Sequence, residues 1–156
     1  MKDKISENFF SLKAQVEEIA LRHHRRPEEI KIIAVSKYAE RNEMLKVYDC
    51  GCRDFGESRV QSANEKMTDL PADISWHFIG RLQSNKLNKV LGRFALLHSI
   101  DTVDLAELIG SKSSGLGITT SILLQVNISE EQTKQGFSSD ELLDRFPYLL
   151  ELKGVS

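Results

Sequence analysis

Apolar and polar positions along this chain follow two different periods, and segments of the two kinds alternate. Over residues 4–24 the apolar residues recur at spacings of three and four, which predicts an amphipathic helix. Residues 32–37 are instead a short apolar, β-branched run that ends on a lysine. A run of this length and composition predicts a buried parallel strand.

The same order of strand and helix repeats along the rest of the sequence. Further strands are predicted at 53–55, 74–80, 96–100 and 119–128, and 152–156 reads as the start of a sixth. Helices are predicted at 40–50, 59–67, 84–92, 102–111 and 138–150, with Ser84, Asp101 or Thr102, and Ser138 or Ser139 as N-caps. Five alternations of this kind favour a parallel sheet with right-handed crossovers. Five units and the start of a sixth are too few for an eight-stranded barrel.

Length and composition indicate one soluble globular domain spanning residues 1–156. The net charge of -2 gives no electrostatic footprint for nucleic acid or an anionic membrane. Cys50 and Cys52 are too close for an ordinary structural disulfide and lack the spacing of a zinc site, so we predict reduced thiols. No run reaches transmembrane length and the first residues do not resemble a signal peptide, which predicts a cytoplasmic protein.

Lys37 is the first candidate functional residue. Strand alternation places it on one face with Ile33 and Val35, at the carboxyl end where ligands bind in parallel sheets. Low-dielectric surroundings disfavour a charged amine and would expose a nucleophilic lone pair, which is the chemistry of a Schiff base. The alternative is a lysine that ends a strand and extends into water.

A set of motifs, in a fixed order, resembles the YggS/PROSC family of pyridoxal-phosphate-binding proteins. The set comprises Ala34-Val35-Ser36-Lys37, Phe55-Gly56-Glu57, Val60-Gln61, the decamer His77-Phe78-Ile79-Gly80-Arg81-Leu82-Gln83-Ser84-Asn85-Lys86, Ser99-Ile100-Asp101 and Gln125-Val126-Asn127-Ile128-Ser129. The resemblance implies an α/β fold of the TIM-type (β/α) barrel, like the amino-terminal domain of alanine racemase. It also implies pyridoxal 5'-phosphate (PLP) held as an aldimine on Lys37.

The resemblance suggests other cofactor-binding residues and shows where the sequence departs from the family. It places His77 in the pocket wall, and Asn127 either touches the ligand or forms a hydrogen bond inside the barrel. Ser58 stands where the family has asparagine, and Arg59 where it has tyrosine. The family's phosphate-binding segments correspond to positions beyond Ser156, so we expect a barrel incomplete at its C-terminus, with five βα units and the start of a sixth strand.

Three further residues are given no part in binding. Lys86, the last residue of the decamer, and Lys134 are interpreted as solvated surface charges, and His98 is assigned no function. No metal site is predicted.

The resemblance implies a non-catalytic PLP carrier in PLP homeostasis, with apo-forms of PLP-dependent enzymes as partners and monomeric full-length relatives. The alternative is a PLP-dependent amino-acid racemase or decarboxylase of the same fold type, in which Lys37 would also act as a base. A sugar aldolase is remote, because no second acid pair supports it. Unpaired strand edges predict that this chain self-associates.

Overall fold

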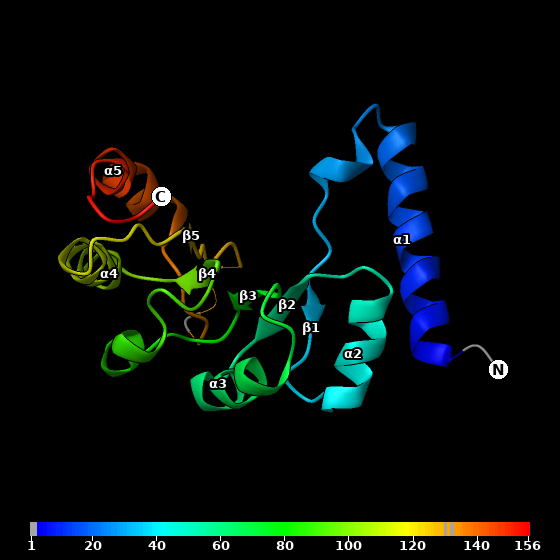
Figure 1. Ribbon diagram of the computed structural model, residues 1–156. Coiled ribbons are helices and arrows are strands. Elements are labelled where there is room, and N and C mark those ends of the chain that lie inside the picture. Colours follow the sequence, from blue (N-terminus) through cyan, green and yellow to red (C-terminus); the bar gives the residue numbers. More distant parts are fainter. Residues whose placement is uncertain (1–2, 130, 132) are drawn as a thin grey trace. The chain divides into compact units, whose positions relative to one another are not determined.

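Short parallel strands, each followed by a helix or turn, make up the computed structural model of this chain (Figure 1). The structure describes residues 3–129, 131 and 133–156. Its α-helices are α1 (Lys4–Arg22), α2 (Arg41–Asp49), α3 (Val60–Asp69), α4 (Val103–Gly115) and α5 (Ser139–Leu150), and its 3-10 helices are η1 (Pro27–Glu29) and η2 (Ser84–Lys89). Its strands are β1 (Ala34–Val35), β2 (Asp54–Glu57), β3 (Ser75–Phe78), β4 (Leu96–Ile100) and β5 (Ile122–Leu124).

The five strands form one parallel sheet in the order β1-β2-β3-β4-β5. Ala34 of β1 pairs with Phe55 of β2, and His77 of β3 pairs with Leu96 of β4. The β4–β5 pairing shifts register between Leu97 and Ile100. The sequence therefore correctly predicted an α/β fold with a parallel sheet.

The chain divides into two compact units, one up to Gly56 together with Gln61–Ser75, the other made of Glu57–Val60 and Trp76–Ser156. We call them unit 1 and unit 2. The apolar residues buried in unit 1 are Ala20, Met44, Cys52, Phe55, Ala63, Leu70 and Ile74. The most deeply buried apolar residues of unit 2 are Phe78, Leu87, Val90, Leu97, Ile100, Ala106, Ile109 and Phe137.

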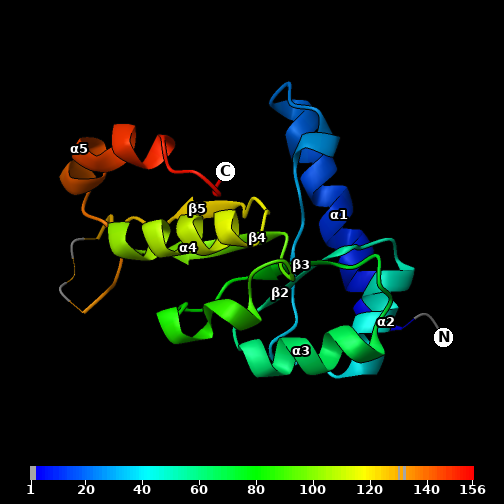
Figure 2. The same cartoon turned by 60° about the vertical axis from the view of Figure 1, so that its left-hand side comes forward.

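In unit 1, α2 begins and ends as the sequence predicts. Glu40 is the N-cap of a capping box with Glu43, in which each side chain accepts from the other residue's backbone N–H. Gly51 follows the helix with a φ of 95°, a conformation that favours glycine. Helix α1 lies beside α2 (Figures 1 and 2).

In unit 2, capping side chains start both long helices. Thr102 accepts a hydrogen bond from the Leu105 N–H at the start of α4, and Ser138 accepts from the Glu141 N–H at the start of α5. Helix α4 lies along β4 and β5 (Figure 2). Val155 forms an isolated parallel bridge with Thr120, in the segment where the sequence predicts the start of a sixth strand.

Two sequence predictions differ from the structure. Ser84 is not an N-cap: it is the first residue of η2, which follows Gln83 without any side-chain cap. The segment has only one apolar side chain to bury, Leu87, and the short 3-10 helix buries it fully. The strands predicted at 32–37 and 119–128 are shorter, because part of their extended backbone is outside ladder pairing.

None of the helices in the described ranges is both long and apolar enough to span a membrane.

Candidate functional site

Lys37 lies two residues after β1, in the turn that follows the strand. The N–H of Ser36 still donates to the carbonyl of Gly56 (2.9 Å), and Ser36 is buried. Val35 and Lys37 face the other way and are exposed, Val35 to 57%. Burial therefore alternates as predicted over residues 35–37, and within unit 1 the Lys37 side chain is exposed and not enclosed by apolar groups. The Lys37 ammonium instead lies 5.1 Å from the centre of the Tyr38 ring.

A cavity of about 330 Å³ adjoins Lys37 within unit 1. Its wall combines the turn after β1 with one side of α3, including Glu65 and Lys66. The Lys66 ammonium donates to the Ser36 carbonyl (2.6 Å), which fixes the backbone just before Lys37. The sequence did not indicate this role of Lys66. The pattern of a helix does not show which strand its lysine side chain contacts.

His77 is buried in unit 2 and pairs with the histidine that the sequence analysis left without a role. Its Nδ1 lies 2.9 Å from Nε2 of His98, so one ring donates a proton and the other accepts. Burial lowers the pKa of His98, and the charge of His77 lowers it further. Strand register could have suggested the pair, because β3 and β4 are neighbours and Leu96 is opposite His77.

Ser58, in unit 2, is half-buried, and its backbone lies against Gly80. A Cβ at Gly80 would overlap the Ser58 carbonyl group, so only glycine fits there. The Ser99 hydroxyl donates to the Gly80 carbonyl from β4. This part of the decamer therefore joins the end of β3 to the segment after β2.

The Asn127 amide is occupied by its own loop in unit 2. It donates to the carbonyls of Glu131 (3.0 Å) and Lys134 (3.2 Å), and its oxygen accepts from Ser129 (3.2 Å). Of the two alternatives left open for Asn127, this geometry favours the structural hydrogen bond. Lys134 is exposed and forms an ion pair with Glu131 (2.7 Å).

Metal-ligating side chains do not gather anywhere in the described part of the chain, where no group of three or more His, Cys, Asp or Glu residues could hold an ion. The chemistry that these residues offer is that of an amine nucleophile on Lys37 and of an imidazole pair on His77 and His98.

Comparisons with known proteins give consistent results. No protein-family model matches the chain. It is 39% identical over 142 residues to the pyridoxal phosphate homeostasis protein of Helicobacter pylori (strain ATCC 700392 / 26695), covering 86% of this chain and 62% of that protein. It is 37% identical over 126 residues to the protein of the same name from Aquifex aeolicus, covering 80% of this chain and 55% of the relative. The chain thus spans little more than half the length of these curated relatives.

Solved structures agree on the fold. PipY of Synechococcus elongatus PCC7942, solved with PLP bound, superposes with a TM-score of 0.75 at 35% identity, covering 90% of this chain and 66% of PipY. Alanine racemase from Bartonella henselae, with covalently bound pyridoxal phosphate, superposes with a TM-score of 0.69 at 11% identity, covering 97% of this chain and 41% of the enzyme. The second likeness concerns the fold alone and identifies it as part of an alanine-racemase-like, TIM-type barrel.

Sequence identity above 30% over most of the chain, together with this fold, agrees with the motifs from Lys37 to Asn127. The chain belongs to the family of pyridoxal phosphate homeostasis proteins.

Proposed function

We propose that this chain binds PLP through an aldimine on Lys37 and serves in the homeostasis of PLP inside the cell. The observation that carries the proposal is the likeness to PipY, whose structure holds PLP. The names of the curated relatives point to the same role. We also propose a cytoplasmic location, with apo-forms of PLP-dependent enzymes as recipients.

The position of Lys37 suits an aldehyde ligand. Its amine is exposed at the carboxyl end of β1 and borders a cavity of about 330 Å³. Lys66 holds the preceding backbone at Ser36, which limits where the Lys37 side chain starts. An aldehyde ligand supplies an electrophilic carbon, and this chain supplies the nucleophilic nitrogen.

The other proposed cofactor-binding residues lie in three different settings. His77 is buried and held by His98, which suits a fixed position in a pocket wall. Ser58 has a half-buried side chain beside the rigid Gly80 contact. Asn127 is already hydrogen-bonded to its own loop, so its proposed role is to shape that loop.

We propose that the bound cofactor is held without turnover, as the name of the relatives suggests. The alternative is a racemase or decarboxylase of the same fold type, for which the only likeness is to structures under 25% identical. The test is proton exchange at Cα of alanine in deuterated water, with PLP present. Exchange at an ordinary enzymatic rate would overturn the carrier proposal.

Borohydride reduction with PLP tests the proposed attachment. We expect the mass of one reduced cofactor per chain, mapped by peptide digestion to Lys37. Lys37→Ala should abolish the adduct and its visible absorbance, whereas Lys86→Ala, at an exposed lysine, should leave both unchanged. Mapping to Lys66, which borders the same cavity, would show that the assignment of Lys37 is wrong.

A further inference from the structure

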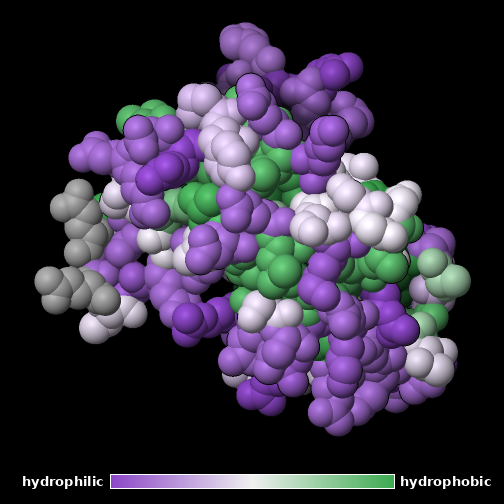
Figure 3. Space-filling view, turned by 90° about the vertical axis from the view of Figure 1, so that its left-hand side faces the viewer, coloured by the Kyte–Doolittle hydropathy of each residue, from purple (hydrophilic) through white to green (hydrophobic). Residues whose placement is uncertain are grey.

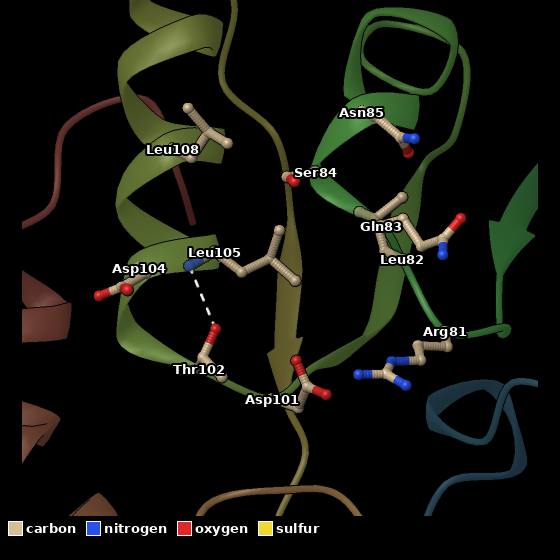
Figure 4. Close-up of a pocket in the computed structure, with 10 residues that line it drawn as sticks. All are labelled: Arg81, Leu82, Gln83, Ser84, Asn85, Asp101, Thr102, Asp104, Leu105 and Leu108. Atoms are coloured by element: carbon tan, nitrogen blue, oxygen red, sulfur yellow. Dashed lines mark hydrogen bonds between the residues drawn. The ribbon is translucent and has the colours of Figure 1, made fainter.

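A second cavity, of about 690 Å³, lies entirely within unit 2 and contains none of the proposed PLP-binding residues. It lies between the loop after β3 and the start of α4 (Figure 4). Strands β3 and β4 are parallel neighbours, so their carboxyl ends open at the same side of the sheet. Arg81 follows β3 and Asp101 follows β4, which brings opposite charges to one cavity.

The two charges face each other without pairing. In Figure 4 the Arg81 guanidinium points toward the Asp101 carboxylate across the lower part of the cavity. Within the described residues neither forms an ion pair within 4.0 Å. Asp104 also lines the cavity, and in Figure 4 its carboxylate points away from Arg81. The cavity lining thus carries one cation, Arg81, and two carboxylates, and Asp101 is the carboxylate toward which Arg81 points.

The cavity wall above these charges is apolar on one side. Leu105 and Leu108 border it from α4, and the Leu105 side chain extends from the helix toward the opposite loop (Figure 4). The N–H of Leu105 is already bonded to Thr102, so the first turn of α4 is fixed. An apolar group bound there would be removed from water against a rigid surface.

We propose that this cavity binds a free α-amino acid with an apolar side chain. Its carboxylate would lie on the Arg81 guanidinium, which can form two parallel hydrogen bonds to a carboxylate. Its ammonium would lie on Asp101, and its side chain on Leu105 and Leu108. Both charges of the ligand are needed, because a ligand with one charge leaves the other protein charge without a partner.

Titration of the 156-residue protein with L-leucine, free of PLP and followed by two-dimensional amide NMR, tests the proposal. We expect saturable shifts at Arg81, Asp101 and Leu105. Two leucine analogues act as ligand controls: 4-methylpentanoate lacks the amine and isoamylamine lacks the carboxylate. Each should bind about tenfold more weakly or worse, because a charge-assisted hydrogen bond is lost.

Matched variants separate this site from general charge effects. Arg81→Gln and Asp101→Asn should each weaken leucine binding about tenfold or more. Lys89→Gln and Asp140→Asn change exposed charges outside the cavity and should leave binding unchanged. Equal binding of the one-charge analogues, unaffected binding in the first two variants, or no shifts up to solubility would overturn the proposal. Because the assay contains no PLP and Lys37→Ala should still bind leucine, the result does not depend on the proposed function.

Discussion

At Gly80 the structure explains directly why the motif has glycine. An alanine Cβ there would overlap the carbonyl group of Ser58, and backbone cannot move aside cheaply. We predict that Gly80→Ala lowers the free energy of unfolding by about 1–3 kcal/mol, measured by urea denaturation. Gly115→Ala is the matched control, because Gly115 has no atom within 4 Å of an added Cβ and ends α4. It should be neutral or stabilising by up to about 1 kcal/mol, and equal effects of both substitutions would contradict the explanation.

The His77–His98 pair predicts a pH dependence of stability. The folded pKa of His98 is below its ordinary value of 6.5, so below that pH the unfolded chain binds more protons than the folded one. Stability contributed by neutral His98 is therefore present above pH 6.5 and lost as the pH falls. We expect a lower free energy of unfolding at about pH 5.5 than at about pH 7.5.

His98→Gln should remove part of that pH dependence while keeping a nitrogen near His77. His23→Gln, at the exposed end of α1, is the control and should leave the difference between the two pH values unchanged. A difference that is the same in wild type and His98→Gln would rule out the pair as its source.

Residue positions were predictable where the information was local or carried by the family motif. The position of Lys37 followed from a strand pattern that ends on a lysine, and in the structure Lys37 lies two residues after β1. The roles of His98 and Lys66 depend on which strand lies next to which, and on where a helix crosses a strand end. The periodicity of a single segment shows neither which strands are neighbours nor where a helix crosses a strand.

N-capping gives a prediction at the scale of the element. Ser138 accepts from the Glu141 N–H at the start of α5, whereas Ser84 caps nothing although its sequence context is similar. Ser138→Ala should cost about 0.5–2 kcal/mol of unfolding free energy. Ser84→Ala should lie within about 0.5 kcal/mol of wild type, since it changes an exposed side chain. A larger loss for Ser84→Ala than for Ser138→Ala would contradict the structure at η2.

The length of an element was harder to predict than its existence. Helices follow from periodicity, and α1, α2 and α5 begin within two residues of their predicted starts. The ends of a strand depend on where its pairing with a neighbouring strand stops, which its own sequence does not show. The β4–β5 pairing, for example, shifts register between Leu97 and Ile100. Beyond it Val126 pairs with Phe137, a neighbour that alternation within 119–128 could not reveal.

Helix α5 carries apolar side chains that unit 2 leaves exposed. Leu143 is 75% exposed and Leu150 70%, and α5 and β5 border an apolar cavity of about 400 Å³. The side of the molecule that carries α4 and α5 shows hydrophobic surface among polar side chains (Figure 3). Exposed apolar patches favour association, so we predict that the 156-residue protein self-associates at high concentration.

Leu150→Lys should reduce this association, because it places a charge in the contact without disturbing a buried residue. Glu151→Lys adds positive charge at an exposed neighbour and serves as the control. The measurement is the weight-average mass by light scattering over a range of concentrations. A monodisperse monomer throughout, or association unaffected by Leu150→Lys, would show that this face is not the contact.

At the scale of the whole molecule, the boundary between the two units runs through two strands. Glu57 of β2 belongs to unit 2, whereas the rest of β2 belongs to unit 1; Ser75 of β3 belongs to unit 1 and the rest to unit 2. Within unit 1 the Ser75 N–H donates to Arg53 (2.7 Å), and within unit 2 the Ile79 N–H donates to Glu57 (2.9 Å). We therefore propose that both units belong to one cooperative domain, since unfolding either would interrupt strands of the other.

Met44→Ala tests this cooperativity from unit 1. Met44 is 2% exposed, and its truncation should cost about 2–5 kcal/mol of unfolding free energy. The single tryptophan, Trp76, is buried in unit 2 and reports on that unit by fluorescence. The circular dichroism instead reports on both units, because α1, α2 and most of α3 belong to unit 1, and α4 and α5 belong to unit 2. In one domain, Met44→Ala lowers the urea midpoint of both signals equally. A shift of the circular dichroism midpoint with an unchanged Trp76 midpoint would mean that the units unfold independently, and the single domain predicted from the sequence would be wrong.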